Sequence, residues 1–230
     1  PFRVKPRLSP SLWYWMFQFA RRCRHENMIE AGAHLKSILD ASMTEYRRLF
    51  DDEGLLGEWQ ENGLLYVLKT DKGMEDFSRT DALLNENFGV AAQRIEGSAL
   101  TDFDGALRAD LAGAFFYEDD AQVRPDVLCR NWVERLRDRG VDFLTNCELQ
   151  SVRKERGKVT AIQTSQGELA ADRYVFALGA LSGRLGSELG CSIPVEPGKG
   201  YSLTMRRPQI CPKHSILFPE HKVGVTPFEE

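Results

Sequence analysis

Residues 173–186 read RYVFALGALSGRLG, and this stretch decides the predicted fold. A nearly continuous apolar run reaches Gly179 and enters a helical pattern at once, so we expect a strand buried on both faces, a glycine turn and a helix. Such a junction can bring backbone N–H groups and a positive helix end close to a phosphate. Taken alone, the pattern is more often a tight turn with no ligand.

Short strands precede this junction, and longer helices dominate the N-terminal half. Ser9 before Pro10 predicts the start of an aromatic helix, and the apolar spacing over 28–50 predicts a long one. The dipeptide Asn62-Gly63 suits a type I′ turn, so we expect 55–60 and 64–70 to form a hairpin. Further helices are expected over 71–88, 125–140 and 180–189, and strands over 113–117, 142–144, 148–153, 159–164, 168–170, 174–178, 200–206, 215–218 and 222–226.

The composition excludes several classes of protein. The chain has 230 residues, of which 42% are hydrophobic, and this is typical of a globular protein. A net charge of −4 gives no basic field for nucleic acid. The four histidines and five cysteines lack the spacing of a zinc site, so we expect no metal and reduced intracellular thiols. The most apolar stretch, 12–20, is far shorter than the roughly 20 residues of a transmembrane helix.

The first predicted helix combines aromatic and cationic residues. Its aromatic residues lie on nearly every side, which favours burial between layers over shallow docking on a membrane. We therefore expect core packing and keep peripheral membrane contact as the alternative. The residues are Trp13, Tyr14, Trp15, Phe17 and Phe19, followed by Arg21, Arg22 and Arg24.

From Gln122 onward, the order and spacing of several motifs resemble the D-amino-acid oxidase superfamily of FAD-dependent oxidoreductases. Within it, the opening Lys5-Pro6-Arg7 and the closing stretch 222–227, KVGVTP, are most similar to the bacterial D-amino-acid dehydrogenases. The motifs are Val123-Arg124-Pro125, Gly140-Val141, Leu149-Gln150-Ser151-Val152, Gly157-Lys158-Val159, Thr164, Gly167, the run 174–180 and Pro197-Gly198-Lys199-Gly200-Tyr201.

The resemblance implies an α+β (mixed α/β) fold, with a substrate domain of helices layered on a mixed sheet and the middle portion of a Rossmann-like FAD-binding domain. We expect 1–118 to be the first part of the substrate domain, 119–196 the middle of the FAD-binding domain, and 197–230 the second, truncated part of the substrate domain. The fingerprint G-x-G-x-x-G, which the family carries near its N-terminus, is absent. We therefore expect an internal fragment.

The resemblance also implies the residues that meet the cofactor. Leu149 matches the family position whose backbone meets the adenine end of FAD. The segment Ala177, Leu178, Gly179 and Ala180 matches the strand end beside the dinucleotide, although Leu181 stands where the family usually has Trp. Lys199 matches the point where the chain re-enters the substrate domain. Both a solvated side chain and a ligand-facing side chain remain possible interpretations for it. We assign no catalytic residue, and the substrate residues are unknown.

By resemblance, the intact protein would oxidise the Cα–N bond of a D-amino acid or related amine by hydride transfer to FAD. We expect this fragment to be inactive alone and to bind FAD weakly or not at all. The alternative is a non-enzymatic α+β binding or interaction domain without a cofactor. The expected partner is a small-molecule amino acid or amine, and the electron acceptor, oxygen or quinone, stays open. The expected location is the cytoplasm, with peripheral attachment to the inner membrane as the alternative.

Overall fold

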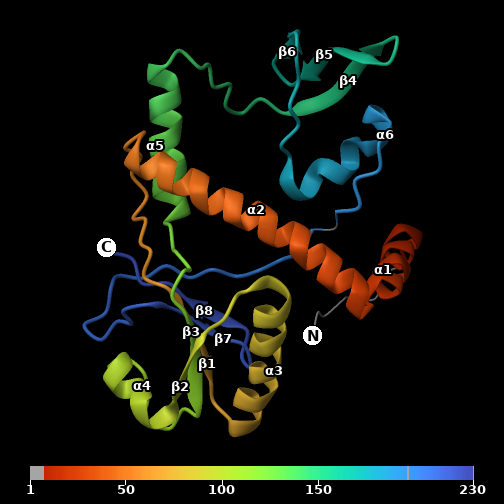
Figure 1. The fold of residues 1–230 in the computed structure, drawn as a ribbon. Helices are drawn as coiled ribbons and strands as arrows, with labels where there is room; N and C mark the ends of the chain where they lie inside the picture. The colour runs from red at the N-terminus through yellow and green to blue at the C-terminus, as the bar shows by residue number, and fades with distance from the viewer. Residues whose placement is uncertain (1–7, 196, 230) are drawn as a thin grey trace. The chain divides into compact units, whose positions relative to one another are not determined.

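The computed structural model describes residues 8–195 and 197–229, and it shows the expected mixture of helices and sheets. Two compact units are built from interleaved parts of the chain: one joins the residues up to Gln18 with Gly140–Thr204, and the other joins Phe19–Arg139 with the residues from Met205 (Figure 1). The motif Lys5-Pro6-Arg7 and the predicted domain limit at residue 196 lie outside the described residues. The assignment of either unit to FAD or substrate stays a prediction.

A five-stranded mixed sheet forms the centre of the larger unit, in the order β2-β3-β1-β7-β8. The central strand β1 (Leu64–Leu68) runs antiparallel to β3 (Gly113–Tyr117) and parallel to β7 (Ser215–Phe218). The edge strands are β2 (Gln93–Glu96) and β8 (Val223–Val225), each antiparallel to its neighbour. The C-terminal segment therefore completes a sheet that begins in the N-terminal half.

Each face of this sheet is covered by its own helix, because side chains alternate between the two faces of a strand. Helix α3 (Asp71–Phe88) covers one face and α4 (Gly97–Phe103) the other. On the α3 side, the buried residues are Leu68, Met74, Phe115 and Tyr117. On the α4 side, they are Leu65, Val67, Ile95, Leu100, Leu107, Ala114 and Ile216.

Two further helices, α2 (His25–Asp51) and α5 (Pro125–Asp138), complete the larger unit. They meet where α2 ends, because the Arg135 guanidinium donates to the Glu53 carbonyl at 3.1 Å and Asn131 Oδ1 accepts from Leu56 N at 2.8 Å. Both helices were predicted from local signals, and both are confirmed.

The smaller unit contains a three-stranded antiparallel sheet of β4 (Leu149–Glu155), β5 (Lys158–Thr164) and β6 (Gly167–Leu169). A turn at Arg156-Gly157 joins β4 to β5, and a turn at Ser165-Gln166 joins β5 to β6. The 3₁₀ helix η1 (Gly179–Leu185) and the short α6 (Gly186–Leu189) follow the sheet. The Glu188 carboxylate accepts from Val152 N at 2.9 Å and thereby joins α6 to β4.

Helix α1 (Pro10–Arg22) forms as predicted, but most of its aromatic residues do not form the expected core. Trp13, Tyr14 and Phe17 are all more than half exposed. Trp15 is half-buried, and its indole N–H donates to the Pro194 carbonyl at 3.3 Å. A helix with aromatic residues on nearly every side can bury only the side that faces a neighbour.

The predicted hairpin is wrong. Residues 55–60 form no strand, and of the two turn residues only Gly63 has a positive φ, 76°. The Asn62 amide instead donates to the Lys213 carbonyl at 3.0 Å, and β1 pairs over five residues with β3. The ladder with a distant strand prevails over the local turn preference.

Two other predicted strands, 142–144 and 200–206, are also wrong. Tyr201 is 92% exposed, so the apolar residues that suggested a strand here are not covered by a sheet. The two elements that the sequence did not predict, β2 and α4, are short and lack a clear apolar period. A strand needs a pairing partner, and an apolar pattern does not identify one.

Candidate functional site

The segment 174–178 does not form the predicted strand buried on both faces. Val175 is 93% exposed, and the segment joins neither of the two sheets in the described part of the chain. The Tyr174 hydroxyl holds its beginning against β5, because it donates to the Thr160 carbonyl at 3.0 Å and accepts from Ala171 N at 2.7 Å. Without strands on both sides, the apolar run has no ladder to enter.

The turn at Gly179 has the backbone that glycine favours. Its φ is 55°, and a Cβ built on it would meet no heavy atom within 4 Å. The space above the turn can therefore admit another group. The helix that follows is a correction to the sequence prediction: η1 is a 3₁₀ helix of seven residues, so a long α-helix does not point its positive end at this turn.

The other predicted cofactor residues lie in the same unit. Leu149 is half-buried at the start of β4, opposite Thr164, while Ala177 and Ala180 are exposed and Leu178 is half-buried. The two neighbourhoods are linked by the bond between Val152 in β4 and Glu188 in α6. Lys199 is exposed, and its ammonium lies 5.2 Å from the ring centre of Tyr201.

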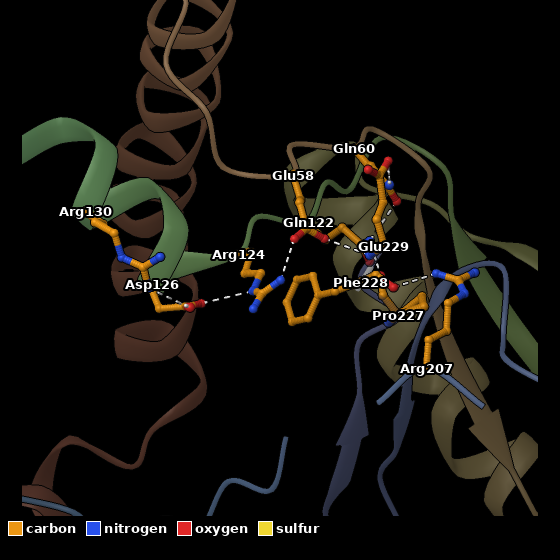
Figure 2. A network of polar contacts seen from close by, with 10 residues as sticks. All are labelled: Glu58, Gln60, Gln122, Arg124, Asp126, Arg130, Arg207, Pro227, Phe228 and Glu229. Atoms are coloured by element: carbon orange, nitrogen blue, oxygen red, sulfur yellow. Dashed lines mark hydrogen bonds and ion pairs between the residues drawn. The ribbon is translucent and has the colours of Figure 1, made fainter. Parts of the chain in front are cut away.

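A polar cluster in the larger unit was not predicted (Figure 2). At its centre is Gln122, which is only 6% exposed. Its amide nitrogen donates to Gln60 Oε1 at 2.8 Å and to the Pro227 carbonyl at 2.7 Å, and its oxygen accepts from the Ser215 hydroxyl at 2.6 Å. We call the polar joint the set of Glu58, Gln60, Gln122, Arg124 and the main chain of 227–229.

An ion pair forms the second half of the polar joint. Arg124 Nη1 and Glu58 Oε1 are 2.7 Å apart, and the other Glu58 oxygen accepts from Glu229 N at 2.7 Å. The Arg124 guanidinium lies 5.9 Å from the ring centre of Phe228. The hydrogen bond that Arg124 donates to Glu58 raises the pKa of Arg124 above its ordinary value. Arg124 belongs to the motif Val123-Arg124-Pro125, but its partners come from other parts of the sequence, so no spacing signal brings them together.

A tyrosine cluster lies on the α3 face of the larger sheet. The Tyr117 hydroxyl donates to Asp81 Oδ1 at 3.1 Å, and the Tyr66 ring packs edge-on against the Tyr117 ring at 5.5 Å. Burial, followed by the Asp81 carboxylate, raises the pKa of Tyr117. Burial also raises the pKa of Tyr66, to which the Asp120 carboxylate contributes.

Removing the Tyr117 hydroxyl is expected to lower the stability near neutral pH by about 1–2 kcal/mol, the usual range for such a hydrogen bond. The folded-state pKa of Tyr117 is raised. Its contribution is therefore complete below the unfolded pKa of about 10 and is lost as the pH rises toward the folded value. Tyr117→Phe should consequently lose less stability than the wild type as the pH rises above about 10.

Thermal unfolding followed by circular dichroism at several pH values measures this difference. Tyr201→Phe is the control, because the Tyr201 ring is 92% exposed. Parallel pH curves for wild type and Tyr117→Phe would contradict the prediction.

Comparison with known proteins supplies the family. Residues 16–229 match the family model described as FAD dependent oxidoreductase. The chain belongs to this family.

Curated relatives of this chain carry the name D-amino acid dehydrogenase. The protein of that name from Vibrio vulnificus (strain YJ016) is 28% identical over 235 residues, which cover 100% of this chain and 56% of that protein. The one from Granulibacter bethesdensis is 27% identical over 231 residues, which cover 98% of this chain and 55% of that protein. The chain thus spans about half the length of the curated relatives it matches.

Solved structures show the same fold. Glycine oxidase from Bacillus cereus superposes with a TM-score of 0.67 at 19% identity, over 87% of this chain and 54% of its own. L-Amino acid deaminase from Proteus myxofaciens gives a TM-score of 0.60 at 18% identity, over 77% and 41% of the two chains. Among residues 8–195 and 197–229, no helix has the length and apolar character of a membrane span, and no three potential metal ligands cluster.

Proposed function

We propose that this chain is the middle part of a longer enzyme that oxidises the Cα–N bond of D-amino acids or related amines, with FAD as the hydride acceptor. The observation that carries the proposal is the match of the whole chain to 56% of a D-amino acid dehydrogenase. The absence of G-x-G-x-x-G from the sequence supports the proposal that the chain is part of a longer protein, because this fingerprint binds the pyrophosphate in the family. Segments outside this chain would supply it.

The residues present fit a share of the FAD site. Leu149 would contact the adenine end, and 177–180 would lie beside the dinucleotide, with the open space above Gly179 leaving room for its approach. When bound, FAD supplies the acceptor for the hydride. The protein's share is to hold the substrate carbon against the flavin ring, and we assign this to the domain of 1–118 and 197–230. Residues 119–196 are then the middle of the FAD-binding domain.

Location and electron acceptor follow from the same proposal. The enzyme would act in the cytoplasm on a small amino acid or amine, with oxygen or a quinone taking the electrons. Peripheral attachment to the inner membrane through the exposed aromatic residues of α1 is the alternative.

Two proteins test the proposal: the 230-residue chain and the full-length protein that contains it. We expect the full-length protein to purify with flavin absorbance, and its flavin to bleach anaerobically with D-amino acids and not with the L-enantiomers. The 230-residue chain should be colourless. Near-stoichiometric flavin in the short chain would overturn its fragment status, and a full-length protein without flavin would favour the non-enzymatic binding domain.

A further inference from the structure

We propose that Glu58 and Arg124 are positioning residues, which hold the substrate-side sheet in register with helix α5 and thereby set the rate of flavin reduction. The inference rests on the proposed function, and it assigns to the polar joint a role that the fold alone does not require. Neither residue needs to touch substrate or flavin.

The polar joint lies where the chain passes between two parts of the larger unit. In Figure 1, α5 stands apart from the sheet that α3 and α4 cover, and the segments 52–63 and 118–124 connect that sheet to the ends of α2 and α5. These two segments pair with each other: Gln60 and Gln122 exchange backbone hydrogen bonds of 3.0 and 2.8 Å, and Arg124 N donates to the Gly57 carbonyl at 2.7 Å. The connection is therefore a paired and bonded structure.

A third segment, 227–229, is fastened to the same place through its main chain. Gln122 donates to the Pro227 carbonyl, Arg207 donates to the Phe228 carbonyl at 2.6 Å, and Glu58 accepts from Glu229 N (Figure 2). This segment follows β8, and the Ser215 hydroxyl that Gln122 also binds begins β7. The polar joint thus fixes the C-terminal half of the sheet as well as β1 and β3.

The backbone at Glu58 shows how tightly the polar joint is determined. Its φ is 48°, in the left-handed region that glycine favours, and such a conformation in another residue persists where its surroundings fix it. Both carboxylate oxygens are used, and the side chains of Arg124 and Glu58 are only 22% and 15% exposed. A largely buried ion pair adds little net stability, because desolvation offsets the attraction. It does define one geometry.

Geometry of this kind matters for hydride transfer, which requires the reacting atoms to be aligned at about 3–3.5 Å. A displacement of about 1 Å that originates far from the reacting atoms can cost about a hundredfold in rate. We therefore expect Glu58→Gln in the full-length holoenzyme to slow flavin reduction by about tenfold to a hundredfold, with little change in KM and in the FAD dissociation constant.

The control is the neighbouring ion pair of Arg47 and Glu61, whose nitrogen and oxygen atoms are 2.6 and 2.9 Å apart. It joins α2 to the same connecting segment, and neither of its residues belongs to the polar joint. Glu61→Gln should reduce its flavin at the wild-type rate. Arg124→Lys, which keeps the charge but loses the planar fork, is the second variant if Glu58→Gln does not fold.

Stopped-flow absorbance of the flavin with a D-amino acid gives the rate, and FAD titration and thermal unfolding are measured on the same samples. A melting temperature that falls while the reduction rate stays at the wild-type value would overturn the positioning role, as would equal slowing in Glu61→Gln. Failure of the proposed function appears in the wild type, as flavin that D-amino acids do not reduce, and the positioning role falls with it. Failure of the positioning role alone appears only in the variants.

Discussion

Valine in place of Gly179 is expected to weaken FAD binding by the full-length protein by at least about tenfold, which corresponds to about 1.4 kcal/mol. The space above this glycine is open within 4 Å, and our proposal places the dinucleotide beside it. A branched side chain would fill that space. It would also strain the backbone, because φ at this position is 55°.

Two further variants separate the loss of space from the backbone strain. Gly190→Val introduces the same side chain at a φ of 78°, again with no heavy atom within 4 Å, but away from the turn at Gly179. Gly179→Asn adds a side chain that tolerates the left-handed region. FAD titrated below all melting temperatures should bind normally to Gly190→Val and weakly to both Gly179 variants. Equal dissociation constants throughout would remove Gly179 from the cofactor site.

Gly97→Ala is expected to destabilise the larger unit by about 2–3 kcal/mol, the cost of adding a methyl group to packed structure. A Cβ at Gly97 would overlap the Leu111 carbonyl oxygen and lie 2.9 Å from the Ala112 carbonyl oxygen. Both oxygens belong to the backbone directly before β3, and Gly97 N donates a hydrogen bond to the same Ala112 carbonyl. The gain of about 1 kcal/mol in helix propensity cannot offset that clash.

Gly105→Ala is the matched control, because its Cβ would come no closer than 3.9 Å to the Thr101 carbonyl oxygen. Urea unfolding followed by tryptophan fluorescence should give a lower midpoint for Gly97→Ala and a nearly unchanged midpoint for Gly105→Ala. A stabilised Gly97→Ala would show that the segment at 111–112 moves away without cost.

Helices were predictable here because their signals are local. Thr70 accepts from Gly73 N at the start of α3, and Gly89 ends the helix with a φ of 66°, so the predicted bounds 71–88 are correct. Pro125 likewise begins α5. The strands that failed depend on partners: the Asn62-Gly63 dipeptide favours a local turn, but β1 pairs with the distant β3, and the apolar segment 174–178 has no neighbouring strands to bury it.

The candidate site residues also fall into two groups, those that the sequence could identify and those that it could not. Leu149 and 177–180 came from the family resemblance, and their role in binding FAD stays a prediction. The polar joint could not be predicted, because its glutamine and glutamate side chains resemble ordinary surface residues until folding brings Gln60, Gln122 and Pro227 together. A buried glutamine whose two amide ends are both bonded can be recognised only in three dimensions.

The parallel pairing of β7 with β1 bears on the order of events during synthesis. Strand β1 emerges early from the ribosome, whereas Ser215–Phe218 emerges after the whole segment Gly140–Thr204 has been made. Contacts of such high sequence separation slow folding, and an incomplete sheet exposes an unpaired edge to other chains. We infer that the edge of β1 that later pairs with β7 stays unpaired while the intervening segment is translated. The nascent larger unit is therefore most prone to aggregation during that interval.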